Sequence, residues 1–204
     1  MGKSYFCQMN KIKHYCHLFG PTSLYCLYTV NDSIEIEKFE NYQKKSWRNK
    51  YQIMTANGVQ TLSVPLVRGK NAQQLITDVK ISYDENWIKN HLFAIKSAYG
   101  KSPYFDFYFP DIEMLLNKRH NYLFDLNIEA LSQMLTRLGL ACEITYTDSY
   151  DNNMEYLKPA NVRFIKYPQV WEEKYNFTPN LSILDLLLCS GPEALVILKM
   201  MQFA

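Results

Sequence analysis

The sequence predicts an α/β or α+β fold, with a mixed sheet and a mainly helical C-terminal half. Three observations lead to this class. Extended, helical and extended patterns succeed one another within the first 40 residues, and an Asn-Gly pair separates two alternating runs at residues 50–67. Apolar residues then recur at helical spacing beyond residue 84. With 204 residues, 48% of them hydrophobic, the chain can bury one core, so we expect a single domain over residues 1–204.

The N-terminal third favours a strand–helix–strand unit followed by a hairpin. Residues 4–9 are expected to form a short strand, and a buried helix is expected to begin at Pro21, since proline suits a first helical turn. Residues 33–39, SIEIEKF, alternate apolar and acidic residues as a half-buried strand does. Asn57-Gly58 tolerates the positive φ angles of a tight turn, which predicts a hairpin there.

The middle of the chain predicts one more strand and then helices. Residues 74–82, QLITDVKIS, are expected to be extended. Asp84 is a candidate N-cap for a helix that reaches residue 97. Apolar spacing makes residues 110–140 mostly helical, with Gly139 as the helix stop.

The last third begins with a strand at residues 141–147, ACEITYT. Residues 148–180 are irregular and punctuated by prolines, and such long segments are often functional. Ser182 is expected to cap a helix, with Asp185 in its first turn. Gly191-Pro192 ends that helix, and a last helix runs toward residue 201.

Charge and hydropathy argue against several classes of protein. The formal net charge is +2 with scattered basic residues, whereas nucleic-acid binders usually have a clustered basic face; only the run at residues 44–50 would favour one. No stretch approaches the roughly 18 apolar residues of a membrane span, and the start lacks the pattern of a signal peptide. We therefore expect a cytoplasmic protein.

Five cysteines, an odd number at irregular spacings, favour free thiols in a reducing compartment. Cys7, His14, Cys16 and His17 include zinc-binding residue types, but their spacing matches no usual paired pattern, so no metal is expected. The sequence identifies no cofactor. Aromatic residues reach 15%, with 16 tyrosines, which suits either a cleft or interface or a tyrosine-rich core.

Three stretches resemble the signature of one family. Residues 39–66 (FENYQKKSWRNKYQIMTANGVQTLSVPL) contain a Lys-x-Ser-aromatic-Arg-Asn run and a hairpin that ends in Ser-Val-Pro. Residues 87–112 (WIKNHLFAIKSAYGKSPYFDFYFPDI) contain Trp-x-x-x-His and then Ala-Tyr-x-x-Ser-Pro-aromatic-aromatic. Residues 179–195 (PNLSILDLLLCSGPEAL) supply a closing motif. The chain thereby resembles the WbqC-like protein family over nearly all of residues 20–195.

The resemblance implies a role in assembling O-antigen or related surface polysaccharides, because genes of this family tend to lie in such clusters. It implies no particular reaction. A transferase-like or sugar-modifying enzyme that acts on an activated or amino sugar is one interpretation. A non-catalytic binding or scaffolding protein of the same pathway is the other. The second is favoured by the loop at residues 16–21, CHLFGP, which keeps Gly20-Pro21 but lacks the family's first proline and its tyrosine.

The first site candidates lie in the motif around residue 48. A guanidinium at Arg48 offers a planar fork for phosphate or carboxylate, and Asn49 adds an amide. With Lys44 and Tyr42 they are expected to bind an anionic small molecule such as a nucleotide-linked sugar. The alternative is structural, because Arg48 could instead pair with Glu37 or Glu40 and fix the turn.

Glu37 and His91 are the candidate proton carriers. A carboxylate at the end of a strand suits a ligand crevice, although acidic residues are more often solvated. Glu37 and Glu40 would lie on opposite faces unless the strand ends between them. His91 can act as a general base near neutral pH, although a lone helical histidine is more often structural.

Two further candidates come from the second and third motifs. Tyr99 is expected to line the same pocket as His91. Asn180 opens the closing motif, where the free amides of a helix start could receive an anion. The alternative for Ser182 and Asp185 is simple helix capping.

Overall fold

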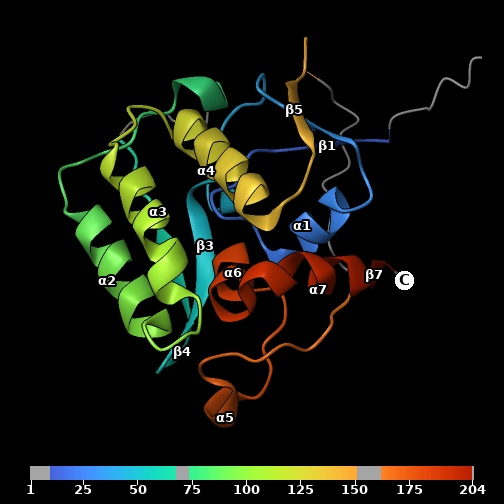
Figure 1. The fold of residues 1–204 in the computed structure, drawn as a ribbon. Coiled ribbons are helices and arrows are strands. Elements are labelled where there is room, and N and C mark those ends of the chain that lie inside the picture. Colours follow the sequence, from blue (N-terminus) through green and yellow to red (C-terminus); the bar gives the residue numbers. More distant parts are fainter. Residues whose placement is uncertain (1–9, 68–73, 151–161, 204) are drawn as a thin grey trace, which may run out of the picture.

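A strand–helix–strand unit opens the fold, and its first strand lies at residues 11–14, where none was predicted (Figure 1). The computed structural model describes residues 10–67, 74–150 and 162–203, and the strand expected at residues 4–9 lies outside them. Strand β1 (Lys11–His14) is followed by helix α1 (Thr22–Tyr28), which begins directly after Pro21 as expected. Strand β2 (Ser33–Ile36) then pairs with β1 in parallel.

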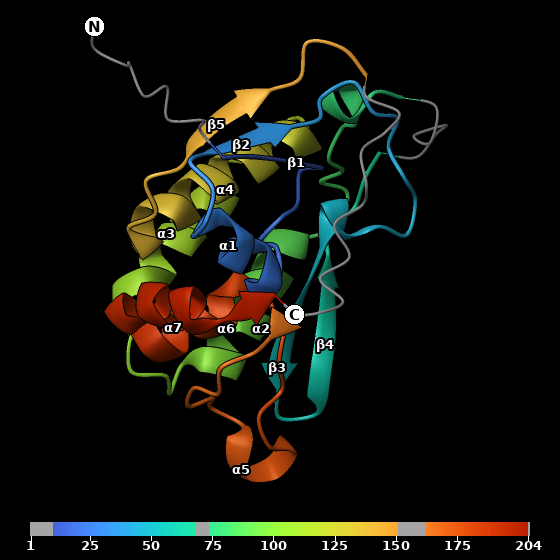
Figure 2. The same cartoon turned by 90° about the vertical axis from the view of Figure 1, so that its right-hand side faces the viewer.

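Strand β5 (Glu143–Tyr146) joins the other side of β2, also in parallel, and completes a three-stranded sheet in the order β1-β2-β5 (Figure 2). Because β2 is the central strand, all four of its residues are buried, and the expectation of a half-buried strand there is wrong. Its acidic residue Glu35 forms ion pairs with Lys11 and Lys13 of the neighbouring strand.

The expected hairpin is formed by β3 (Lys50–Thr55) and β4 (Gly58–Ser63). Gly58, at φ +98°, supplies the left-handed backbone that the turn requires. A short antiparallel pair, β6 (Val162–Arg163) with β7 (Gln202–Phe203), lies near the C-terminus. Parallel and antiparallel pairing therefore both occur, as expected, but in separate small sheets of the described chain.

The strand expected at residues 74–82 is replaced by a 3-10 turn, η3 (Ile76–Asp78), with single bridges on either side. The backbone of this segment bonds to different parts of the chain and so pairs with no single strand. Ile76 N–H donates to Glu40 O at 2.9 Å, whereas Ile81 N–H donates to Asn121 O at 3.0 Å. Three of the four apolar residues in this segment, Ile76, Val79 and Ile81, are nevertheless buried, whereas Leu75 is exposed. The apolar pattern therefore indicated burial, but no strand ladder formed.

Two antiparallel helices, α2 (Trp87–Tyr99) and α3 (Phe105–Asn117), form a hairpin beside the β3–β4 pair, and α4 (Leu123–Leu138) follows (Figure 1). Asp84 is not the N-cap of α2; its carboxylate instead accepts a bond from Ser82 Oγ at 2.8 Å. The helical block expected at residues 110–140 is two helices. The first begins before Pro110, which α3 carries in its interior.

Helix α6 (Ile183–Ser190) is buried along its whole length in the centre of the core. Ser182 caps it, since Leu184 N–H donates to Ser182 Oγ at 3.3 Å as expected. Helix α7 (Ala194–Met200) follows, and a single-turn helix, α5 (Glu172–Tyr175), interrupts the irregular region. Within the described ranges, no helix combines the length and apolarity needed to cross a bilayer.

Candidate functional site

The carboxyl ends of the three parallel strands meet along one edge of the sheet. Glu37 directly follows β2, and its N–H donates to His14 O at the end of β1, at 3.1 Å. Thr147 directly follows β5, and its N–H donates to Ile36 O at 3.1 Å. Ligands of open α/β sheets bind outside such strand ends. We call Tyr15, His17, Glu37, Glu40 and Arg48, which gather here, the edge cluster.

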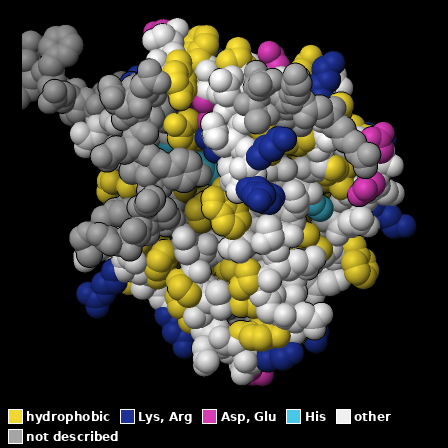
Figure 3. All heavy atoms as spheres, turned by 180° about the vertical axis from the view of Figure 1, so that it is seen from behind, with side chains coloured by type: hydrophobic (Ala, Val, Ile, Leu, Met, Phe, Trp, Pro, Cys, Tyr) yellow, Lys and Arg dark blue, Asp and Glu magenta, His cyan; other side chains and the backbone are white. Residues whose placement is uncertain are grey.

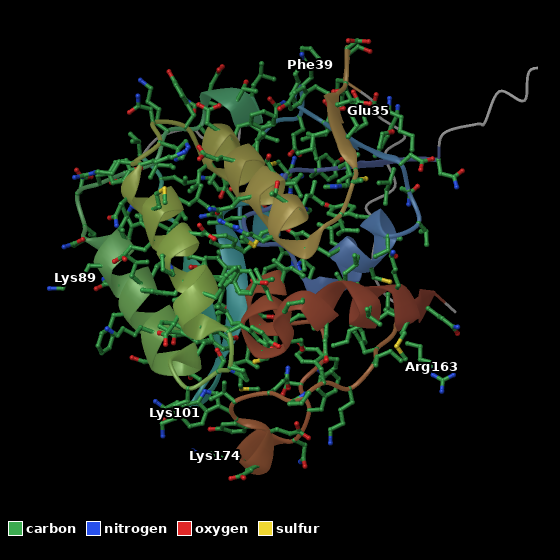
Figure 4. The ribbon with its side chains drawn as sticks, viewed as in Figure 1. Glu35, Phe39, Lys89, Lys101, Arg163 and Lys174 are labelled. Atoms are coloured by element: carbon green, nitrogen blue, oxygen red, sulfur yellow. The ribbon has the colours of Figure 1, made fainter. Side chains whose placement is uncertain are left out.

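Glu37 is 0% exposed, so its carboxylate is removed from water. Its Oε1 accepts hydrogen bonds from Phe39 N–H at 2.6 Å and from Thr147 Oγ1 at 2.9 Å. Because β2 ends at Ile36, the alternation of faces does not apply beyond it, and Glu40 turns toward the same region. Figure 4 labels Phe39 in the segment that leaves the strand.

Arg48 and Glu40 form a buried ion pair in the edge cluster. Arg48 Nε donates to Glu40 Oε1 at 2.7 Å, and Nη2 donates to Oε2, a bidentate arrangement. Burial raises the pKa of the Glu40 carboxyl, while the two bonds from Arg48 oppose that rise. The guanidinium also lies over the ring of Tyr15, with Cζ 4.3 Å from the ring centroid. The structural pairing weighed for Arg48 therefore exists, with Glu40 as the partner.

Two histidines follow one another at the end of β1. His14 is held by protein groups, with Nδ1 2.6 Å from Tyr15 O and Nε2 2.6 Å from Tyr28 Oη. Burial lowers the pKa of His14 to about 4. Burial and the charges of His14 and Arg48 lower the pKa of His17 to about 3. Its Nδ1 is buried and has no hydrogen-bond partner within the described part of the chain.

His14, Cys16 and His17, the described members of the possible zinc cluster, are not grouped as metal ligands. Cys7 lies outside the described residues, and both ring nitrogens of His14 contact protein groups. Burial raises the pKa of the Cys16 thiol, which disfavours the thiolate that a metal requires. Over residues 10–67, 74–150 and 162–203, no three His, Cys, Asp or Glu side chains are grouped as metal ligands.

The sequence model of the WbqC-like protein family matches residues 27–158 and 149–197, which is most of the chain. The chain belongs to the WbqC-like protein family. The match contains Glu37, Glu40, Arg48 and Thr147 but begins after Tyr15 and His17.

One relative is the uncharacterized protein Rv1507c of Mycobacterium tuberculosis, which is 26% identical over 196 residues. The alignment covers 75% of this chain and 81% of the relative. No solved structure matches the chain.

Asn49 and Tyr42 of this WbqC-like protein are joined by a hydrogen bond, and Asn49 directly follows Arg48 of the edge cluster. Tyr42 Oη donates to Asn49 Oδ1 at 3.1 Å. Asn49 Nδ2 donates to Val64 O at 2.8 Å and to Ser63 Oγ at 3.3 Å. Lys44, by contrast, is exposed. The amide of Asn49 therefore ties the turn after β2 to the end of the hairpin.

His91 lies on the inner face of α2, against the hairpin. Its Nδ1 is 3.1 Å from Tyr51 Oη, and its Nε2 is 3.3 Å from Ser63 O. Trp87 packs edge-on, with ring centroids 5.0 Å apart. Burial lowers the pKa of His91 to about 4. With both ring nitrogens engaged, His91 has the geometry of a structural histidine.

Tyr99 belongs to a second buried polar group, around Asp185 on α6. Asp185 Oδ2 accepts bonds from Tyr167 Oη at 2.6 Å and from Gln169 Nε2 at 2.7 Å. Tyr99 also interacts with this carboxyl and accepts a bond from Met54 N–H at 3.2 Å. We call Tyr99, Tyr167, Gln169 and Asp185 the Asp185 cluster. Its carboxylate holds the irregular region against the core and does not cap the helix.

Asn180 stands at a backbone crossing. Its φ is +60°, a conformation that asparagine adopts more readily than most residues. Its Oδ1 accepts a bond from Ser23 N–H at 3.1 Å. Close by, Ile183 N–H donates to Gly20 O at 2.9 Å. The closing motif and the Gly20-Pro21 loop are therefore tied together through their backbones.

Sequence reasoning missed four residues of this region. Tyr15, Thr147 and Asn127 were not predicted as site residues, and His17 was considered only as a zinc ligand. Asn127 is fully buried on α4, and its Nδ2 donates to Arg48 O at 2.7 Å. The available signal was position, since Tyr15, His17 and Thr147 each lie just beyond a parallel strand.

Positive charge is spread over the face that Figure 3 shows. Seen from behind in Figure 3, lysine and arginine side chains lie singly or in pairs around the outline and near the centre, without a broad field of one sign. This face thus offers no counterpart, over the described residues, to the basic surface of a typical nucleic-acid binder.

Proposed function

We propose that this WbqC-like protein is a cytoplasmic enzyme of O-antigen or surface-polysaccharide biosynthesis that transfers a group to or from an activated or amino sugar. The reaction would take place at the edge cluster. The observation that carries the proposal is Glu37, a fully buried carboxylate fixed at the carboxyl end of the central parallel strand. Membership of the WbqC-like family supports the pathway.

Glu37 is the proposed general base. Phe39 N–H and Thr147 Oγ1 orient its Oε1, so the carboxylate needs little reorganisation before it receives a proton. The acceptor's hydroxyl or amine loses that proton as its oxygen or nitrogen bonds to the donor's electrophilic carbon. The bond to the leaving group breaks at the same time, and the leaving group departs with the electron pair. His17, whose pKa is lowered to about 3, is neutral at pH 7 and adds no positive charge to the cluster.

Arg48 is the proposed positioning residue for an anionic donor such as a nucleotide-linked sugar. Two of its donors already bond Glu40, so a phosphate would have to compete with that carboxylate or approach the exposed Lys44. Tyr15 and His17, both members of the edge cluster, are half-buried, so this part of the cluster reaches solvent.

The cytoplasmic location rests on thiol chemistry. Cys16, Cys26, Cys142 and Cys189 are all free in the described part of the chain. A reducing compartment keeps such thiols free.

A second candidate is a non-catalytic binding or scaffolding protein of the same pathway. The specific observation in its favour is that protein groups already bond the predicted ligand residues Arg48 and Asn49 and the predicted base His91. On this view the motifs preserve the fold, and function lies on the surface.

Thermal denaturation against a ligand panel separates the two candidates. The panel holds nucleotide sugars, acyl-CoA thioesters and free amino acids, each with the natural protein. A ligand at 100 times its Kd stabilises by about 2.7 kcal/mol, which raises the midpoint of a protein of this size by roughly 5 to 10 °C.

We expect one donor class to give this shift, and Glu37→Gln to abolish turnover of that donor with an amino-sugar acceptor. Asp185→Asn is the matched control, since it makes the same chemical change in the other buried cluster and should retain turnover. Equal turnover by Glu37→Gln would contradict the proposed base. The absence of any shift and any turnover would favour the scaffolding role.

A further inference from the structure

Large apolar side chains lie exposed on the outer faces of α2 and α3. Phe93 on α2 is 71% exposed, and Phe107 and Met114 on α3 are 67% and 60% exposed. Phe107 and Met114 are seven residues apart with Pro110 between them, so the three share one face of α3. Neighbouring exposed apolar groups of this size are typical of a contact surface.

A surface groove of about 680 Å³ runs between the two helices. Lysines of α2 and an acidic residue of α3 line its length, while Asp84 and Glu85, before α2, and Arg119, after α3, line its end. Its lining includes Lys89, Phe93, Lys96, Phe109 and Glu113. Lys89, labelled in Figure 4, projects from α2 away from the body of the molecule.

The charges on the two helices have the same spacing. Lys89 and Lys96 are seven residues apart on α2, and Asp106 and Glu113 are seven apart on α3. All four are exposed, and none forms an ion pair within the described residues. Seven residues are nearly two helical turns, so each pair lies on one face of its helix. Two such faces laid parallel bring both opposite-charge pairs together at once.

A twofold axis produces that parallel arrangement. Within one chain α2 and α3 are antiparallel, joined by the short connection at residues 100–104 (Figure 1). A twofold axis perpendicular to α3 of the first copy places α3 of the second copy antiparallel to it. Because α2 and α3 of one copy are antiparallel, α3 of the second copy then runs parallel to α2 of the first. Lys89 and Lys96 then face Asp106 and Glu113 of the second copy, and symmetry repeats both contacts.

We propose that the α2–α3 surface is the interface of a homodimer, with α3 of each copy seated along α2 of the other. The occupant is a second copy because one chain supplies both the cationic and the acidic face at matching intervals. Phe93, Phe107 and Met114 supply the apolar centre that a stable interface needs. The interface involves no residue of the edge cluster, so its failure would not affect the proposed catalytic function.

Sedimentation equilibrium of the full chain tests the apolar centre. The natural protein should approach twice the chain mass of 24.1 kDa. Phe107→Glu should weaken dimerisation by about thirtyfold or more, the range of a central aromatic residue in an interface. Val196→Glu is the matched control, because Val196 is 58% exposed on α7, outside this surface. A monomer at every concentration, or a dimer unaffected by Phe107→Glu, would overturn the proposal.

Charge exchange tests the occupant. Lys89→Glu with Lys96→Glu makes both faces acidic, and Asp106→Lys with Glu113→Lys makes both basic. Each double variant should be monomeric alone, and an equimolar mixture should form a heterodimer that weakens with added salt. A peptide or unrelated protein as the natural occupant predicts no such recovery on mixing. Mixed double variants that remain monomeric would overturn the proposed pairing.

Discussion

The edge cluster and the Asp185 cluster both bury a carboxylate completely, yet they are built differently. The Asp185 carboxylate accepts hydrogen bonds from neutral donors, Tyr167 and Gln169. Burial raises the pKa of Asp185, and Tyr99, together with these two donors, opposes that rise. The edge cluster brings two carboxylates, a guanidinium and a histidine together where parallel strands end.

Burial of a polar residue therefore does not by itself distinguish a structural cluster from a functional site. The donors to Asp185 come from the irregular region and from α2, so they fasten one part of the chain to another. In the edge cluster the charges act on one another: Glu40, Arg48 and Glu37 all influence the pKa of half-buried Tyr15. Mutual perturbation of titratable groups in a partly accessible place is typical of functional sites.

Breaking the ion pair should have the largest effect on stability. Arg48→Ala leaves the Glu40 carboxylate buried without its cation, and such losses cost about 3 to 5 kcal/mol of unfolding free energy. Urea denaturation followed by circular dichroism measures the change. Arg48→Met combined with Glu40→Leu removes both charges and should recover most of the loss. A single-variant loss below about 1 kcal/mol would contradict the importance of the pair.

Asp185→Ala should have a smaller effect. Gln169 Nε2 keeps its bond to Thr178 O at 3.0 Å, so Tyr167 Oη is the donor that loses its acceptor while it remains buried, which costs about 1 to 3 kcal/mol. Asp185→Asn keeps an oxygen acceptor and should lose less. The same urea titration checks both variants. If Asp185→Ala left stability unchanged but abolished ligand binding, the assignment of the two clusters would have to be reversed.

Local patterns predicted the elements whose causes are local. Pro21 starts α1, Ser182 caps α6, and Gly58 gives the hairpin its left-handed residue, all through contacts within a few positions. The prediction of a strand at residues 74–82 was wrong because the backbone of this segment bonds to Glu40 and Asn121, which lie far apart in the chain. The apolar pattern indicated that Ile76, Val79 and Ile81 are buried, and these side chains are buried without forming a strand.

The candidate site was predictable in part for the same reason. Arg48 and Glu40 were recognised as a possible pair because they lie eight residues apart on either side of one turn. Thr147 bonds Glu37 across 110 residues of chain, a contact that no local spacing encodes. The contact between Thr147 and Glu37 follows from the strand order β1-β2-β5, which places the end of β5 beside the end of β2.

Acid should destabilise the fold through two buried histidines that lie outside both clusters. The pKa values of His14, at the edge of the sheet, and His91, on α2, fall from an ordinary 6.5 to about 4 in the folded protein. The unfolded chain therefore binds protons first, so stability is complete above pH 6.5 and falls as the pH drops toward 4. Each histidine contributes up to about 1.4 kcal/mol per pH unit in that window.

Urea midpoints at intervals from pH 7 to pH 4.5 measure this slope. His91→Gln should reduce the slope of stability against pH by the contribution of one histidine. The carboxyls of Glu40 and Asp185, whose pKa values are raised by burial, contribute a slope of opposite sign, and they do so equally in the natural protein and in the variant. An unchanged slope in the variant would show that His91 is not held neutral by the fold.

Glu37→Gln should change stability least and function most. The amide oxygen can still accept from Phe39 N–H and Thr147 Oγ1, so we expect a loss below about 1 kcal/mol in the urea titration. The amide cannot take a proton at neutral pH, so turnover should fall by the 10²- to 10⁴-fold typical of a lost general base. Asp185→Asn, the same substitution of oxygen by nitrogen in the other cluster, should keep its turnover. A large loss of stability with Glu37→Gln, or an equal loss of turnover in both variants, would mean that the carboxylate at the end of β2 fastens the sheet, as Asp185 fastens the irregular region, and is not the base.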